Sequence, residues 1–179
     1  MGMVAVDFST SYAQWWGHTL TYGSIAVLLS GSVLLAVVFL RPYALIDDYP
    51  EDIRQAAPAP TAGQKRAGLI SGTVFVIVIF ASITAVVWAW GAQPPEASFL
   101  ELALMTFALS VMFALFDLLI IDWLIICTWR PKALVYPGTE DSAGWRDYGF
   151  HVKEQLQPKA LLVLVGATSV IGLLVWGLT

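Results

Sequence analysis

The stretch FLELALMTFALSVMFALFDLLIIDWLIICTWR, residues 99–130, decides the fold of this chain. Glu101, Asp117 and Asp122 are its only charged residues before Arg130. A bilayer has a hydrocarbon core about 30 Å thick, which a helix of about 20 residues crosses. Residues 99–129 therefore predict a membrane-spanning helix. Because the run is longer than required, the helix should tilt or project beyond the lipid.

Three further apolar runs are also long enough to cross a membrane. They cover residues 18–40, 67–90 and 158–178. Of the 179 residues, 58% are hydrophobic and only 12% are charged, so a soluble fold would have to bury all four runs inside one small domain. The predicted fold class is all-α. We expect a polytopic membrane protein with a four-transmembrane-helix bundle, in which residues 1–179 form a single membrane domain.

The basic residues lie on one side only of the predicted spans. All nine fall in two stretches between apolar runs: Arg41, Arg54, Lys65 and Arg66, then Arg130, Lys132, Arg146, Lys153 and Lys159. Lys and Arg near span ends are retained on the cytoplasmic side. The pattern predicts cytoplasmic loops at residues 41–66 and 130–157 and both termini outside the cytoplasm. It indicates a multi-pass protein of the cell (plasma) membrane.

The connections between the spans differ in length and character. Residues 1–16 contain no Lys or Arg, which favours a retained first span over a cleavable signal. Residues 91–98 allow only a turn, so the second and third spans should be neighbours. Pro50, followed by two acids, indicates the start of a short helix. Residues 142–157 fit either an amphipathic segment in the headgroup layer or a packed cover over the helix ends.

Two carboxylates inside the third run are the main candidate functional residues. Asp117 and Asp122 lie in an otherwise apolar helix, where ionised groups are costly and usually face the bundle interior. Five residues of regular α-helix separate them by about 140°, which disfavours a shared metal site unless the helix is wound i→i+5. A relay in which each carboxylate meets a different neighbour fits this spacing better.

A purely structural role for the two carboxylates is equally compatible with the sequence. Asp122 would then pair with a cation at the inner ends of the helices, such as Arg41 or Lys159. Asp117 would accept a hydrogen bond from a hydroxyl across the bundle, the candidates being Ser24, Ser30, Ser82, Thr84 and Thr168.

The two histidines and the single cysteine carry weaker signals. His18 lies near Trp15 and Trp16, where anchoring at the membrane interface is the ordinary role. His151 lies in the second loop and, with Glu140, could complete a carboxylate–imidazole cluster. No HExxH, CxxC, Walker or glycine-rich nucleotide signature is present, so no metal is firmly predicted, the cofactor is unknown, and no nucleic-acid partner is expected. Cys127 is alone, which excludes an intramolecular disulfide.

Small residues indicate how the predicted helices meet. They recur in the first, second and fourth runs, as in Gly166, Ser169 and Gly172. Such stripes let helix backbones approach closely, which favours association in lipid. The stripes predict a compact bundle, and they are equally compatible with a face that joins copies in a homo-oligomer.

Three blocks carry a resemblance to a known family. FDLLIIDWL at residues 116–124, PGTE at 137–140 and YGFH at 148–151 resemble a family of small prokaryotic four-span integral membrane proteins of uncharacterised activity. The resemblance covers the third span and the inner loops. It implies that Asp117, Asp122, Glu140 and His151 belong to one unit where this span meets those loops, and it supplies no reaction.

Three classes of function fit these observations. The leading interpretation is an accessory or assembly protein that lies in the lipid bilayer and binds a protein partner through its cytoplasmic loops. The second is a proton- or ion-coupled transporter subunit that uses Asp117 and Asp122. The third is a membrane enzyme acting on a lipid or quinone, with Asp122, Glu140 and His151 at the cytoplasmic interface. The sequence leaves open whether the protein is an enzyme.

Overall fold

Four long helices dominate the computed structural model, which describes residues 8–179. They are α1 (Phe8–Leu40), α3 (Ala62–Gly91), α4 (Phe99–Phe116), which continues directly as η2 (Asp117–Trp129), and α6 (Pro158–Leu178). All four are long and apolar enough to cross a membrane, and no strand occurs in the described range. The prediction of an all-α, four-span membrane protein is confirmed. The first residues of the predicted outer N-terminal segment, 1–7, lie outside the described part.

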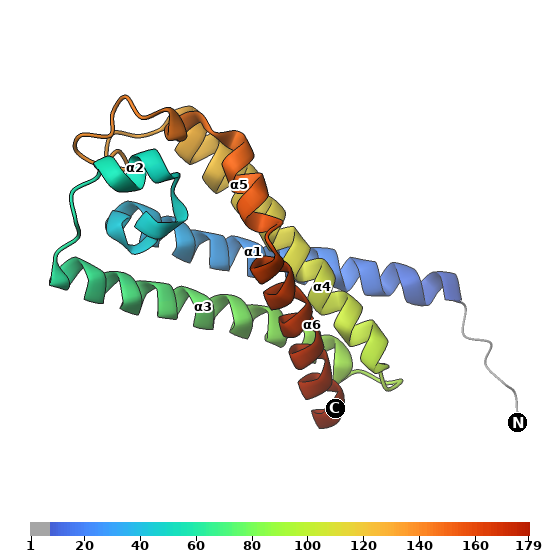
Figure 1. Ribbon diagram of the computed structural model, residues 1–179. Helices are drawn as coiled ribbons and strands as arrows, with labels where there is room; N and C mark the ends of the chain where they lie inside the picture. The colour runs from blue at the N-terminus through green and yellow to red at the C-terminus, as the bar shows by residue number, and fades with distance from the viewer. Residues whose placement is uncertain (1–7) are drawn as a thin grey trace, which may run out of the picture.

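The helices are arranged as two pairs that cross one another. α1 packs along α3 and α4 packs along α6 (Figure 1). The two pairs meet where α1 contacts α4 and where α3 contacts both α4 and α6. The turn predicted at residues 91–98 joins α3, which ends at Gly91, to α4 and lies at the same end of the molecule as the C-terminus. We call this the turn end. The opposite end, which carries residues 41–61 and 130–157, is the loop end.

Local sequence signals account for the helix boundaries. Thr61 and Gln64 form a capping box at the start of α3, and Ser98 and Glu101 form another at the start of α4. Each box satisfies backbone N–H groups that a helix start leaves without partners. At Gly172, a Cβ atom would lie 3.1 Å from the Cα of Ala103, so glycine permits the close contact between α6 and α4.

The loop end folds into a compact cover of short helices. These are η1 (Pro42–Asp48), α2 (Glu51–Ala56), η3 (Ala143–Arg146) and α5 (Tyr148–Gln155). The short helix that Pro50 indicated is therefore present as α2. Residues 142–157 do not form one continuous amphipathic helix, because Asp147 separates η3 from α5 with a non-helical backbone.

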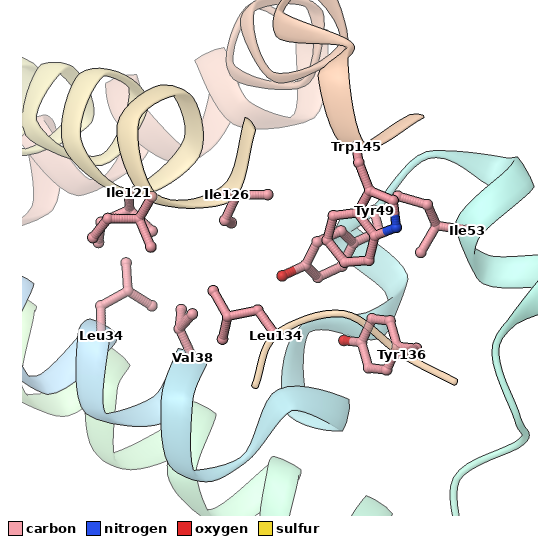
Figure 2. Packing of buried hydrophobic residues seen from close by; sticks show 10 residues of the cluster. Leu34, Val38, Tyr49, Ile53, Ile121, Ile126, Leu134, Tyr136 and Trp145 are labelled. Atoms are coloured by element: carbon pink, nitrogen blue, oxygen red, sulfur yellow. The ribbon is translucent and has the colours of Figure 1, made fainter. Parts of the chain in front are cut away.

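An aromatic cluster holds this cover together. The Trp145 ring is fully buried, with Tyr49 at 5.2 Å and Tyr136 at 6.1 Å between ring centroids, and Ile53 is buried beside them (Figure 2). The indole N–H of Trp145 donates to the Thr139 carbonyl at 2.8 Å. Burial of this aromatic surface stabilises the folded loops. The buried position of Trp145 agrees with the interpretation of residues 142–157 as a packed cover over the helix ends.

Candidate functional site

The winding of η2 brings the two membrane carboxylates toward one place. Asp117–Trp129 is π-helical over 13 residues, and at its end the Arg130 N–H donates to the Ile125 carbonyl at 2.8 Å, a separation of five residues. In i→i+5 winding, residues five apart lie nearly one above the other. The angle of about 140° expected for a regular α-helix is therefore wrong here. π-Helical segments are rare, mostly a single turn long, and frequent at functional sites.

Asp117 and Asp122 both line a cavity of about 360 Å³ near the loop end. Its walls come from all four long helices and from η1 and α5. Apolar side chains such as Leu34, Phe75 and Phe113 form the part between the spans. The titratable side chains of the lining, Tyr49 apart, are Asp48, Asp117, Asp122, His151, Glu154 and Lys159. The cavity thus combines an apolar wall between the spans with a concentration of titratable groups, of which Asp48, His151 and Glu154 come from the loop-end helices.

His151 is the direct partner of Asp122. Its Nδ1 lies 3.2 Å from Asp122 Oδ1, and the two side chains are only 7% and 14% exposed. Burial by itself lowers the pKa of His151, but the hydrogen bond to Asp122 and the neighbouring Cys127 thiol raise that pKa to about 10. The raised pKa favours the imidazolium form of His151 at neutral pH. The sequence suggested Arg41 or Lys159 as the partner of Asp122, and this expectation is wrong.

The second ring nitrogen of His151 has no partner among the described residues. Nε2 is shielded from solvent and makes no hydrogen bond, although His151 lines the cavity and is only 6% exposed. One turn further along α5, the Gln155 side-chain amide donates to the Ala114 carbonyl at 3.1 Å, which ties α5 to α4. An orphaned buried donor costs free energy, so Nε2 marks a position where an acceptor would be stabilised.

The remaining charged groups of the lining lie at its rim and differ in their partners. Lys159 Nζ lies 3.6 Å from Glu154 Oε2, with side chains 75% and 36% exposed. Asp48 enters the cavity from η1, and burial together with the nearby Asp47 carboxylate raises the pKa of Asp48. The sequence interpretation missed Asp48 as a site residue. Its only sequence signal was its place in an acidic group, which is typical of a solvated loop.

Three of the four residues that the family resemblance grouped together meet at this cavity. Asp117, Asp122 and His151 line it, whereas Glu140 is exposed and does not. The expected hydrogen bond from a hydroxyl to Asp117 is also missing among the described residues. Ser24 and Ser82, for example, donate instead to carbonyls of their own helices at 2.7 Å. Outside the cavity, His18 Nε2 lies 2.9 Å from the Val86 carbonyl oxygen and links α1 to α3.

The geometry of the described residues does not offer a metal centre. Within the described residues, no group of three or more His, Cys, Asp or Glu side chains is arranged to hold a metal ion. Comparison of the chain with protein-family models, with curated proteins and with solved structures finds no match. The resemblance to a family of small four-span proteins therefore stays a prediction. Fold and site together define a multi-pass α-helical membrane protein with a charged cavity between its helices.

Proposed function

We propose that the protein is a proton-coupled transport protein or transporter subunit, in which Asp117, Asp122 and His151 move protons between the loop end and the membrane interior. The observation that carries the proposal is that η2 directs two carboxylates, five residues apart within an apolar span, to one cavity. Ionisable groups at such depth are expensive, and they commonly mark proton or ion pathways.

The three residues are suited to different steps. The Asp122–His151 pair is buried and mutually neutralised, so it holds a proton firmly. Asp117 lies further from the loop end along the same helix and has no basic partner in the described structure. A carboxyl group without a fixed counter-charge changes its protonation state with less reorganisation than a paired one does. Asp117 is thus the proposed group that takes up and releases protons, and the Asp122–His151 pair connects Asp117 to the loops.

The proposal includes an orientation. Because every Lys and Arg of the chain lies in the loop-end stretches or at the adjoining starts of α3 and α6, we place the loop end in the cytoplasm and both termini outside, in the plasma membrane. The cavity then communicates with the cytoplasmic side. An enzyme site built from Asp122, Glu140 and His151 is less well supported, because Glu140 is exposed and outside the cavity.

Proton movement in liposomes tests this function. Purified protein would be reconstituted with a pH-sensitive dye inside the vesicles, and a proton gradient would be imposed. Wild-type protein should dissipate the gradient, and Asp117→Asn should reduce the rate to that of empty vesicles. Glu140→Gln is the matched control, since it also removes one carboxylate but lies on the exposed surface. Equal rates for empty and protein-containing vesicles would refute the proposal and favour the partner-binding interpretation.

A further inference from the structure

The cavity beside η2 contains more acidic groups than its basic groups neutralise. Its two bases are each engaged: His151 pairs with Asp122 at 3.2 Å and Lys159 pairs with Glu154 at 3.6 Å. Asp48 and Asp117 line the same space and have no basic partner among the described residues. A partly buried cavity with unpaired carboxyl groups disfavours anions, and a cation would stabilise the ionised form of these groups.

The walls of the cavity indicate which kind of cation it would accept. Inorganic divalent ions need several oxygen or nitrogen ligands converging at short distance, and the described residues offer no such group. The cavity instead presents aromatic rings from Tyr49, Phe75 and Phe113 together with aliphatic side chains. Aromatic faces beside carboxylates are the combination that recognises ammonium groups, because a ring attracts a poorly hydrated cation electrostatically.

A second, independent feature restricts the ligand further. His151 lines this cavity, and its Nε2 atom is buried without a hydrogen-bond partner in the described structure. While Nδ1 is engaged with Asp122, an imidazolium has one remaining donor, at Nε2. A ligand oxygen would satisfy that donor and remove the free-energy cost of leaving it unpaired.

We infer that the cavity is a binding site for a small organic cation that carries an ammonium group and an oxygen acceptor. The ammonium group lies against the Asp117 and Asp48 carboxylates and the aromatic rings, and the oxygen accepts from His151 Nε2. This inference rests on the proposed function and extends it by naming the class of solute. A volume of about 360 Å³ accommodates a molecule of this size.

The same carboxylate then couples cation and proton. Asp117 binds the cation only when ionised, so a proton and the cation exclude each other, and each weakens the binding of the other by the same factor. The other charged and titratable side chains of the cavity lining come from several elements. They are Asp48 from η1, Tyr49 directly after η1, Asp122 from η2, His151 and Glu154 from α5, and Lys159 from α6. α1, α3 and α4 contribute only apolar side chains to the lining.

Choline, its uncharged isostere 3,3-dimethylbutan-1-ol and tetramethylammonium form a matched set of probes. Binding would be measured by calorimetry on the full-length protein in maltoside micelles, which contain no choline groups, at about pH 8, where an unperturbed carboxyl group is ionised. Choline should bind, the uncharged isostere should bind at least about tenfold more weakly, and tetramethylammonium, which lacks the oxygen, should bind roughly 2- to 12-fold more weakly than choline.

Variants assign the binding to this cavity. Asp117→Asn and Asp48→Asn should each weaken choline binding about tenfold or more, whereas the exposed Glu140→Gln should leave it unchanged. Far-ultraviolet circular dichroism checks that each variant is folded. If one variant does not fold, the other variant and the comparison with the uncharged isostere still test the binding site. Lower pH should weaken choline binding to the wild type.

The outcomes separate this inference from the proposed function. Absence of choline binding, equal binding of the uncharged isostere, or unchanged binding to Asp117→Asn would each overturn the inference. Proton movement that depends on Asp117 would nevertheless leave the proposed function standing. Choline binding that Asp117→Asn abolishes, in a protein that moves no protons, would support the binding site and overturn the proposed function.

Discussion

Removal of the His151 imidazole tests how much the buried Asp122–His151 pair stabilises the protein. His151→Ala leaves the Asp122 carboxylate without its partner at a site where the two side chains are only 7% and 14% exposed. Breaking a buried charge pair in this way typically costs about 3–5 kcal/mol of unfolding free energy, because the remaining charge stays desolvated. A change of that size is a large fraction of the stability of an ordinary domain.

The chain contains its own control, an ion pair of similar type in a different environment. Lys159 and Glu154 lie 3.6 Å apart with side chains 75% and 36% exposed. Solvent screens such a pair and its side chains are held loosely, so Lys159→Ala should cost no more than about 1 kcal/mol. The two substitutions therefore compare a buried with an exposed pair at the same end of the same molecule.

Unfolding by sodium dodecyl sulfate in maltoside micelles, followed by near-ultraviolet circular dichroism, would measure both changes. Asp122→Asn and the double variant Asp122→Asn/His151→Ala complete a double-mutant cycle. This cycle separates the energy of the Asp122–His151 pair from the packing lost with the imidazole ring. The expected coupling energy is above about 1 kcal/mol for Asp122–His151 and near zero for Glu154–Lys159. Equal costs for His151→Ala and Lys159→Ala, or a coupling energy near zero for the buried pair, would refute the reasoning.

Three further predictions follow from the same structure. Because the folded-state pKa of His151 is about 10, above its ordinary value of 6.5, its stabilising contribution should be complete below about pH 6.5 and should be lost as pH rises through about 10, seen as convergence of wild-type and His151→Ala unfolding curves. Gly172→Ala should cost about 1–3 kcal/mol in the same unfolding assay, because its Cβ would press on the α4 backbone at 3.1 Å, whereas Gly166→Ala, which meets nothing within 4 Å, should be neutral or slightly stabilising. For topology, in a variant with Cys127 replaced by Ser, a cysteine at Gln93 should react with an impermeant thiol reagent from outside intact cells, and one at the exposed Glu140 should not; the reverse pattern would invert the proposed orientation.

The candidate site was only partly predictable, and particular residues show why. Asp117 and Asp122 stand out in the sequence because a charge within an apolar run is rare and costly. Their convergence could not be read from the spacing, because it depends on i→i+5 winding, and no local rule distinguishes a π-helical from an α-helical apolar run. His151 was a candidate, but its partner was misassigned, because that pairing depends on how α5 folds back onto η2.

The sequence by itself determined the class of protein, the positions of the four spans and the depth of the two carboxylates. Apolar run length and the hydrogen-bonding needs of a backbone in lipid leave a helix as the only solution for each run. Only the tertiary structure decided which polar groups share the cavity. Asp48, His151 and Lys159 reach it from η1, α5 and α6, so the site depends on contacts between segments distant in the chain. Loop closure and aromatic packing around Trp145, which no periodicity encodes, bring those segments together.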